Sequence, residues 1–427
     1  MFVSLVTLSI TQFPMEKPNN TITDVLEGIV TEILVRLPLR SISRFKSVSQ
    51  TWKSAIESVY FRRLFVSLHQ NTSSSWSLLL RKEEFIDFHG CGTWGLPKSL
   101  GSYIQCMELD GKFEYMWFSG SNGLILMHRK LGTWKNYVGN PVLQQWVEIP
   151  ACPGSYTFFC GVVTGVDEVG VVLSFKVVKS GNMFLNKGEM YMPLYVYSSE
   201  TGFWIHKEVV CPVRLPNFYD PISLNGTLYF SQRGDSYNRR PGLMVLDFYG
   251  KPKDCHFIPL PDHALNRNKT CLATSSGFVM YIKTLAQPGG NLLKVWRLID
   301  DSAWQLMWEV SIPFIGCYAP MSMHPFDRNI VYLWSHDNCY LMSFNLQTQN
   351  YKIFGDESKH HDCYINHRTC EKHMYKISRP YSVSEYEGPI ILQQWVLSRW
   401  MQSVPRPPEV EMIDTTSLLS LVVKNEE

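Results

Sequence analysis

A run of histidine and cysteine residues near the C-terminal end has the ligand chemistry of a zinc site. Its members are His360, His361, Asp362, Cys363, His367, Cys370 and His373. The intervals from Cys363 to His367 and from Cys370 to His373 are close to those of known zinc sites. However, the run contains no C-x-x-C pair, and the polar residues around it are typical of an exposed loop. We therefore expect no bound metal and no other cofactor.

A second group with binding chemistry is a basic stretch that includes an aromatic residue. It contains Arg233, Tyr237, Arg239 and Arg240. Such a loop is usually only solvated, and its functional interpretation is a contact with a protein substrate.

Common catalytic and nucleotide-binding motifs are missing from the sequence. There is no G-x-x-x-x-G-K-[ST], no G-x-G-x-x-G after a strand, no H-E-x-x-H and no G-x-S-x-G. The segment Gly120 to Gly123 is interpreted as a turn that enters a strand, not as a nucleophile elbow. We therefore expect a binding protein and not an enzyme.

The clearest periodic pattern lies near the N-terminus. Apolar residues recur at steps of three and four between Leu26 and Leu37, which predicts an amphipathic helix. Asp24 can cap its start. Pro38 disfavours the helical region for Leu37, so the helix should end there.

Two further short helices are expected after this one. Ser41 can cap the second helix, and the third should begin at Val48 or Ser49. The three helices can pack around Phe45 and Trp52, but so small a unit has little core. Because the first helix carries more apolar surface than the unit can bury, we expect a partner to cover the rest.

The stretch from Ile33 to Trp52 reads ILVRLPLRSISRFKSVSQTW and resembles an F-box of the large plant F-box families. The likeness covers about forty residues and fixes a Leu-Pro step, a basic-Ser-aliphatic step and a Trp at set distances. The family usually opens its first helix with Leu-Pro. This chain has Val25-Leu26 there, which bears on the affinity for the partner. The alternative is an ordinary three-helix cap on a larger domain.

The resemblance implies a docking module that binds a Skp-type adaptor, and through it a cullin and a ubiquitin ligase. The family pattern places the adaptor contacts on Leu26, Ile29, Ile33, Leu34, Leu37, Pro38, Leu39, Ser41, Ile42 and Phe45. It gives Val48 and Trp52 the role of holding the helices together.

Composition limits the other function classes. The chain has 427 residues and a formal net charge of +2, so no strong attraction to nucleic acid or membranes is expected. No apolar run is long enough for a transmembrane helix, and the apolar N-terminus lacks the positive start of a signal peptide. The eleven cysteines form no C-x-x-C pair and are expected to be free thiols in a reducing compartment. We expect the cytoplasm, the nucleus or both.

Five segments follow from these patterns. Residues 1–22 are expected to be a disordered N-terminus, 23–68 the F-box and 69–75 a Ser-rich linker. Residues 76–404 contain short runs of β-branched and aromatic residues between turn residues, which is typical of an all-β domain. Residues 405–427 are expected to be a tail.

The strand-like runs repeat along the chain. Asn122-Gly123, Asn225-Gly226, Ser276-Gly277 and Asn329 each precede such a run, at spacings of 103, 51 and 52 residues. A period near fifty with several strands per unit is typical of a β-propeller. We count six units and expect six blades, with seven possible, because residues 374–404 are available to complete the ring.

An aromatic residue near the end of a unit, such as Trp146, Trp204 or Trp304, is expected to pack between neighbouring blades. The domain resembles the F-box-associated, kelch-like region of plant F-box proteins, although double-Gly kelch signatures are missing. A pair of β-sandwiches is the structural alternative.

These resemblances imply the substrate-recognition subunit of a Skp–cullin–F-box ubiquitin ligase, whose propeller binds an unknown protein target for degradation. A scaffold that keeps the F-box without causing degradation is the first alternative. The second is a propeller copper oxidase of the galactose oxidase type, which would need clustered Tyr, His and Cys ligands. No such signature is visible.

Overall fold

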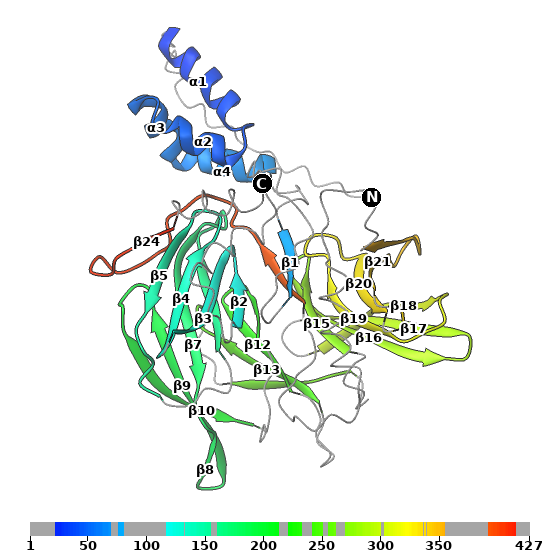
Figure 1. Ribbon diagram of the computed structural model, residues 1–427. Coiled ribbons are helices and arrows are strands. Elements are labelled where there is room, and N and C mark those ends of the chain that lie inside the picture. The colour runs from blue at the N-terminus through cyan, green and yellow to red at the C-terminus, as the bar shows by residue number, and fades with distance from the viewer. Residues whose placement is uncertain are drawn as a thin grey trace, which may run out of the picture.

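The computed structural model has helices at its N-terminal end and strands after them (Figure 1). It describes residues 22–69, 76–80, 117–131, 133–154, 160–212, 221–232, 241–250, 255–261, 270–299, 303–335, 337–338, 340–354 and 392–415.

Four helices form the N-terminal unit, one more than the sequence predicts. They are α1 (Ile22–Leu34), α2 (Leu39–Phe45), α3 (Gln50–Glu57) and α4 (Val59–His69). The predicted third helix is interrupted at Ser58, whose backbone is extended (φ −66°, ψ 149°). Its hydroxyl accepts a hydrogen bond of 3.1 Å from the Phe61 backbone N–H, a contact typical of a helix start. The result is a separate helix, α4, that leads to the β domain.

The helix boundaries correct two of the predictions. Helix α1 ends at Leu34 and not at Leu37, whose N–H donates to the Leu34 carbonyl in a tight turn. Pro38, and not Ser41, lies at the start of α2, which fits a residue with a fixed φ and no N–H to leave unpaired. Helix α3 follows Ser49, as predicted.

The strands form five blades in which neighbours along the chain pair as antiparallel strands. Blade 1 contains β2 (Trp117–Ser121), β3 (Leu124–Leu131), β4 (Thr133–Asn140), β5 (Gln145–Ile149) and, from the C-terminal segment, β24 (Ile413–Asp414). Blade 2 contains β6 (Cys160–Val166), β7 (Val172–Ser180), β8 (Phe184–Asn186), β9 (Glu189–Ser198) and β10 (Trp204–Cys211). Blade 3 contains β11 (Ile222–Leu224), β12 (Thr227–Gln232), β13 (Gly242–Asp247) and β14 (His256–Pro259). Blade 4 contains β15 (Thr270–Ser275), β16 (Phe278–Gln287), β17 (Gly290–Ile299) and β18 (Ala303–Ile312). Blade 5 contains β19 (Tyr318–Met323), β20 (Ile330–Ser335), β21 (Tyr340–Asn345) and β22 (Tyr351–Phe354).

The described residues thus form a propeller of five blades, which corrects the prediction of six or seven. Five of the six sequence units each supply a blade of four or more strands. The first unit supplies only β1 (Trp76–Leu80), which pairs with β23 (Leu392–Val396) from the C-terminal part of the chain. The local repeat was therefore real, but one copy forms a joint between the two ends of the domain. The paired-sandwich alternative is wrong, because each sheet is a separate meander of consecutive strands.

The joint between the chain ends is fixed to two blades by the side chain of Gln394 in β23. Its Oε1 accepts hydrogen bonds from the Thr274 backbone N–H (3.1 Å) and hydroxyl (2.6 Å). Its Nε2 donates to the carbonyls of Thr274 (2.8 Å) and Met323. One amide group therefore connects the closing strand to the inner strands of blades 4 and 5.

After β23 the chain forms an extended segment, residues 397–415, which we name the C-terminal strap. Figure 1 shows it running from β23 toward β24, between the helices and blade 1. Strand β24 pairs with β5, and the Thr415 hydroxyl makes a 2.7 Å hydrogen bond with Gln144 Oε1. The segment expected to be a tail from residue 405 is therefore packed as far as Thr415.

The repeated dipeptides are tight turns between the first and second strands of three blades. Both residues have positive φ, at 44° and 83° in Asn122-Gly123, 48° and 80° in Asn225-Gly226, and 50° and 80° in Ser276-Gly277. This is the two-residue hairpin turn that matches the twist of the strands, and it explains why Asn and Gly mark the repeat.

We expect Gly123→Ala to destabilise the fold more than Gly277→Ala. An alanine at either position meets the steric cost of positive φ, about 1–2 kcal/mol. At Gly123 the added Cβ would also lie 2.4 Å from the Ser398 backbone nitrogen, whereas at Gly277 it meets nothing within 4 Å. The clash should add about 1–3 kcal/mol to the loss of unfolding free energy. Equal losses in chemical denaturation of the two variants would contradict this account.

Two tryptophans confirm the predicted packing between neighbouring blades. Trp204 of blade 2 donates its indole N–H to the carbonyl of Pro150 at the end of blade 1, at 2.9 Å. Trp304 of blade 4 donates in the same way to Pro259 at the end of blade 3, also at 2.9 Å. The same contact is thus repeated two blades further on.

Two smaller expectations concern cysteines and membranes. In the part of the chain that the structure describes, no disulfide bond is formed by Cys152, Cys160, Cys211, Cys255, Cys271 or Cys317. Within the described part of the chain, no helix has the length and hydropathy needed to cross a bilayer.

Candidate functional site

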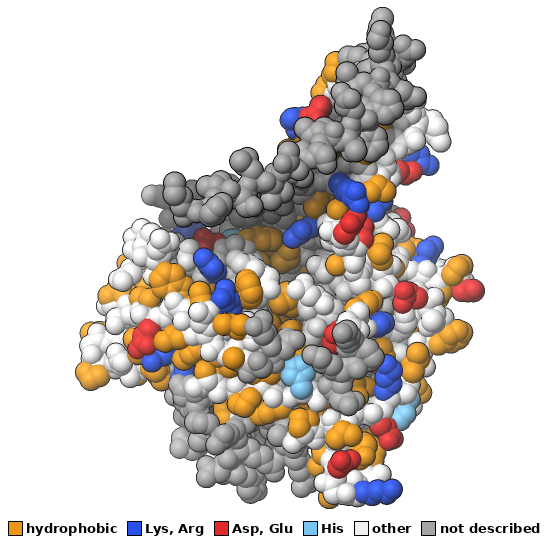
Figure 2. Space-filling model, turned by 180° about the vertical axis from the view of Figure 1, so that it is seen from behind, with side chains coloured by type: hydrophobic (Ala, Val, Ile, Leu, Met, Phe, Trp, Pro, Cys, Tyr) orange, Lys and Arg blue, Asp and Glu red, His pale blue; other side chains and the backbone are white. Residues whose placement is uncertain are grey.

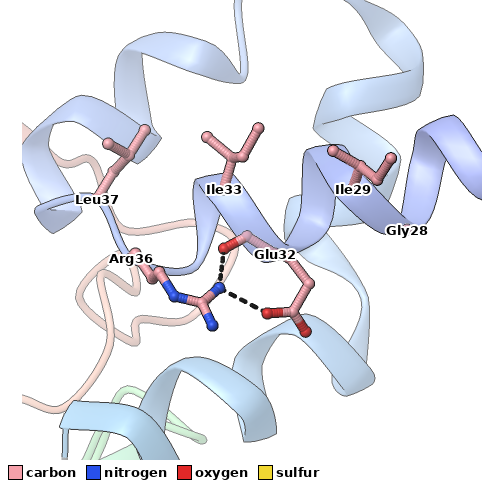
Figure 3. A pocket seen from close by; sticks show the side chains of 6 residues that line it. All are labelled: Gly28, Ile29, Glu32, Ile33, Arg36 and Leu37. Carbon is pink, nitrogen blue, oxygen red and sulfur yellow. Dashed lines mark hydrogen bonds and ion pairs between the residues drawn. The ribbon is translucent and has the colours of Figure 1, made fainter.

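Helix α1 presents a row of apolar side chains to solvent. Ile29 and Ile33 are 53% and 57% exposed, and with Leu37 they follow one another at intervals of four residues. Residues four apart lie on the same side of a helix, so Ile29 and Ile33 form a stripe on α1, and Leu37 continues it from the turn that follows the helix. Figure 3 shows the three side chains standing side by side along a shallow groove, beside Gly28. Exposed isoleucines in a row are a feature of surfaces that bind another protein.

A charged pair borders this stripe. Arg36 Nη1 lies 2.6 Å from Glu32 Oε2 and also donates to the Glu32 backbone carbonyl (Figure 3). Both side chains are more than half exposed, so the pair contributes little to stability. Its position beside the apolar row gives the surface a polar rim with one charge of each sign.

The other side of the helical unit is buried. Leu34, Val35, Leu39 and Ile42 have at most 2% of their surface exposed and belong to one hydrophobic cluster. The same cluster includes Ile56, Phe61 and Phe65, and it continues into the propeller with Ile125, Met127, Tyr137, Trp146, Val171, Trp395, Leu397 and Trp400. The helices and the propeller therefore share one core. Ile29 and Ile33 of the exposed stripe do not belong to this cluster, whereas Leu37 packs against its edge.

The structure divides the predicted adaptor contacts into three groups. Ile29 and Ile33 are exposed and free to bind. Four others are partly buried: Leu37, Pro38, Ser41 and Phe45. Leu34, Leu39 and Ile42 are buried in the shared core, where their side chains are not accessible to a partner in this structure. The side chain of Leu26 lies outside the described residues.

The two predicted core residues have opposite outcomes. The ring of Trp52 packs against Phe45, with centroids 5.4 Å apart, and contacts the shared core as expected. Val48 is 63% exposed and is not part of the shared core. It lies in the turn between α2 and α3, where the chain leaves the core before Ser49.

Sequence reasoning missed the residue that joins the helices to the propeller from the far end of the chain. This residue is Trp400 of the C-terminal strap, and Phe61 and Phe65 of α4 pack against its ring. The ring centroids are 6.0 Å and 5.4 Å apart, in edge-on arrangements. No local pattern marks Trp400, because its partners lie more than 330 positions earlier.

On the propeller, exposed apolar side chains are scattered over several blades. They include Leu185, Phe203, Phe278, Leu306, Ile315, Phe326 and Tyr351. Figure 2 shows hydrophobic side chains spread among charged ones over this surface. The predicted substrate-binding residues Arg233, Tyr237, Arg239 and Arg240 lie outside the described residues, as does the run from His360 to His373. Within the described part, no three His, Cys, Asp or Glu side chains are grouped as a metal site would need.

Comparisons with known proteins agree with the two-part architecture. A model of the F-box domain matches residues 18–64. A model described as F-box protein At3g26010-like, beta-propeller, matches residues 74–406. The chain is 47% identical to F-box protein At3g26010 of Arabidopsis thaliana over 97% of its own length and 98% of that protein. It is 40% identical to F-box protein At1g49990 and 36% identical to F-box protein At3g28330 of the same plant. These matches cover 88% and 92% of the chain and 97% and 98% of the relatives.

Proposed function

Because the chain belongs to the F-box proteins with an At3g26010-like β-propeller, we propose that it is the substrate-recognition subunit of a Skp–cullin–F-box ubiquitin ligase. In this function the helical unit docks on a Skp-type adaptor, which joins a cullin. The propeller holds a protein target for ubiquitination and proteasomal degradation.

One observation carries the proposal. Helix α1 lies in a matched F-box domain and leaves Ile29 and Ile33 more than half exposed. A helix that is already packed on its other side has no intramolecular use for these side chains. A partner with an apolar surface would bury them and gain about 25 cal/mol for each Å² removed from water.

The direct adaptor contacts of this proposal are fewer than the family pattern implies. They are Ile29, Ile33 and Leu37, with Pro38, Ser41 and Phe45 at the edge. The buried Leu34, Leu39 and Ile42 act indirectly, because they hold α1 and α2 on the shared core.

The propeller supplies proximity and not catalysis. The conjugating enzyme carries the reactive ubiquitin thioester. A target held on a rigid propeller presents its lysines to this thioester at a high effective concentration. We also propose that the target binds on the propeller and that the propeller is of the kelch-like kind. The proposed location is the cytoplasm, the nucleus or both.

A scaffold that binds the adaptor without degrading a target is the main alternative, because it uses the same face of α1. The propeller oxidase is not favoured by any arrangement of ligands in the part of the chain that the structure describes.

The test uses the full chain with Ile29→Asp and Ile33→Asp, because deleting the helices would expose the shared core. Proximity labelling with this variant should capture the target. The half-life of the target should be longer in cells that express the variant than in cells that express the wild-type chain. A proteasome inhibitor should remove that difference. Captured proteins with neither attached ubiquitin nor altered turnover would favour the scaffold instead.

A further inference from the structure

We infer that Trp400 is a positioning residue that fixes the F-box on the propeller, so that the adaptor and the target are held by one rigid body. The consequence for ubiquitin transfer rests on the proposed function. The contact between α4 and the propeller, which we name the helix–propeller joint, is described by the structure itself. Trp400 is 4% exposed and lies between Phe61 and Phe65 of α4, both fully buried. A side chain from the strap thus lies in the shared core and contacts both phenylalanines of α4.

Trp400 is well placed for this role because the strap is anchored on both sides of it. Before it, Trp395 donates its indole N–H to the Gly123 carbonyl (3.3 Å). After it, Thr415 binds Gln144 and strand β24 extends blade 1. Because neither end of the strap is free, the indole is a fixed part of the propeller surface.

Charged contacts beside Trp400 limit rotation of the helical unit relative to the propeller. Arg62 lies 3.5 Å from Asp167, and Arg63 pairs with Glu168, both in the turn between β6 and β7. Asp167 is held in place, since its Oδ1 accepts the backbone N–H groups of Val169 (3.0 Å) and Val171 (2.8 Å). Figure 2 shows basic and acidic side chains meeting where the helices join the propeller.

The joint continues to the exposed face of α1. His69, in the last turn of α4, hydrogen-bonds through Nε2 to the carbonyl of Val35, directly after α1, at 3.0 Å. Its ring also packs on Phe65, with centroids 4.3 Å apart. A continuous series of contacts therefore leads from the closing strand β23, through Trp400 and α4, to the stripe that carries Ile29 and Ile33.

The test measures the joint in the full chain. Spin labels are attached through non-natural amino acids at two exposed positions, Ser43 on α2 and Glu208 on β10, and the distance distribution between them is recorded. We expect a narrow distribution for the wild-type chain and one at least twice as broad for Trp400→Ala. Trp400→Phe, which keeps an aromatic ring between the two phenylalanines, should remain narrow. Trp304→Ala is the matched control, since it removes a partly buried indole from blade 4, away from the helices.

The functional readout is the pattern of ubiquitin on the chain itself in a ligase reconstituted with adaptor, cullin and conjugating enzyme. A rigid body restricts transfer to a few propeller lysines, so Trp400→Ala should lower the share of the most modified lysine at least threefold. Adaptor affinity should change less than twofold. A merely structural role would leave this pattern unchanged in molecules that remain folded.

An unchanged distance distribution in Trp400→Ala would overturn the inference, as would a broad distribution with an unchanged lysine pattern. If Trp400→Ala does not fold, Arg62→Glu replaces it, because that change repels Asp167 and leaves the aromatic contact in place. It should broaden the distribution by at least half. A wild-type chain that binds no adaptor would refute the proposed function, while the distance measurement would still decide on the joint.

Discussion

Replacing Ile29 and Ile33 together by aspartate is expected to weaken adaptor binding more than 100-fold. About half of each side chain is exposed, so docking should gain about 1–1.5 kcal/mol from each isoleucine. Loss of both gains corresponds to roughly 30–150-fold in affinity. Burial of two carboxylates without partners adds a desolvation cost that raises the loss further. Titration calorimetry with a purified Skp-type adaptor measures the change.

The same variant should keep the stability of the wild-type chain, because exposed positions rarely change it by more than about 0.5 kcal/mol. Leu68→Asp is the matched control, since Leu68 is 47% exposed on α4 and lies outside the α1 stripe. Its adaptor affinity should equal that of the wild type. Binding of the double variant within threefold of wild type would show that α1 is not the docking face.

The second large effect is expected from Gln394→Leu, which should open the joint between the chain ends. The change removes the side-chain partner of the Thr274 N–H and carbonyl, and it leaves the Met323 carbonyl only the longer 3.4 Å hydrogen bond from the Ser322 hydroxyl. Each buried backbone group left without a partner costs about 1–3 kcal/mol, so we expect a loss of about 3–5 kcal/mol. That is a large part of the 5–15 kcal/mol by which typical proteins are stable. The melting temperature in a thermal scan at fixed rate should fall by about 6–15 °C.

Gln393→Leu is the control for this experiment. Gln393 is the neighbouring residue in β23 and lies opposite Leu79 of β1. Its replacement should lower the melting temperature by only a few degrees. If both leucine variants melted together, the closure of the ring would not depend on the Gln394 amide.

The sequence predicted the features that arise from local contacts. The Asn-Gly and Ser-Gly turns are read from two adjacent residues, and they located the second strand of three blades correctly. The predicted blade number was wrong because β1 pairs with β23, whose residues lie 312 to 320 positions later in the chain. A repeat reports that a unit can form strands, but it does not say which strands those will pair with.

The candidate site shows the same limit. The F-box pattern identified the helices and the residues Ile29 and Ile33, which the structure leaves exposed. It could not separate them from Leu34, Leu39 and Ile42, because all five are apolar residues at helical spacing. Only the propeller decides which side is core, since its own side chains complete the cluster beneath the helices.

The position of Trp400 has a consequence for the order in which the protein is made. A ribosome releases α4 early, but the indole that packs against Phe61 and Phe65 is synthesised about 335 residues later, after strands β1 to β23. Domains generally fold in the order of their synthesis, yet the contact between this helical unit and the propeller must wait for nearly the whole chain. A nascent or truncated polypeptide can therefore carry the α1 stripe without the contact that fixes it relative to the propeller. The fixed arrangement of the two parts is thus reached only when translation of the propeller is complete.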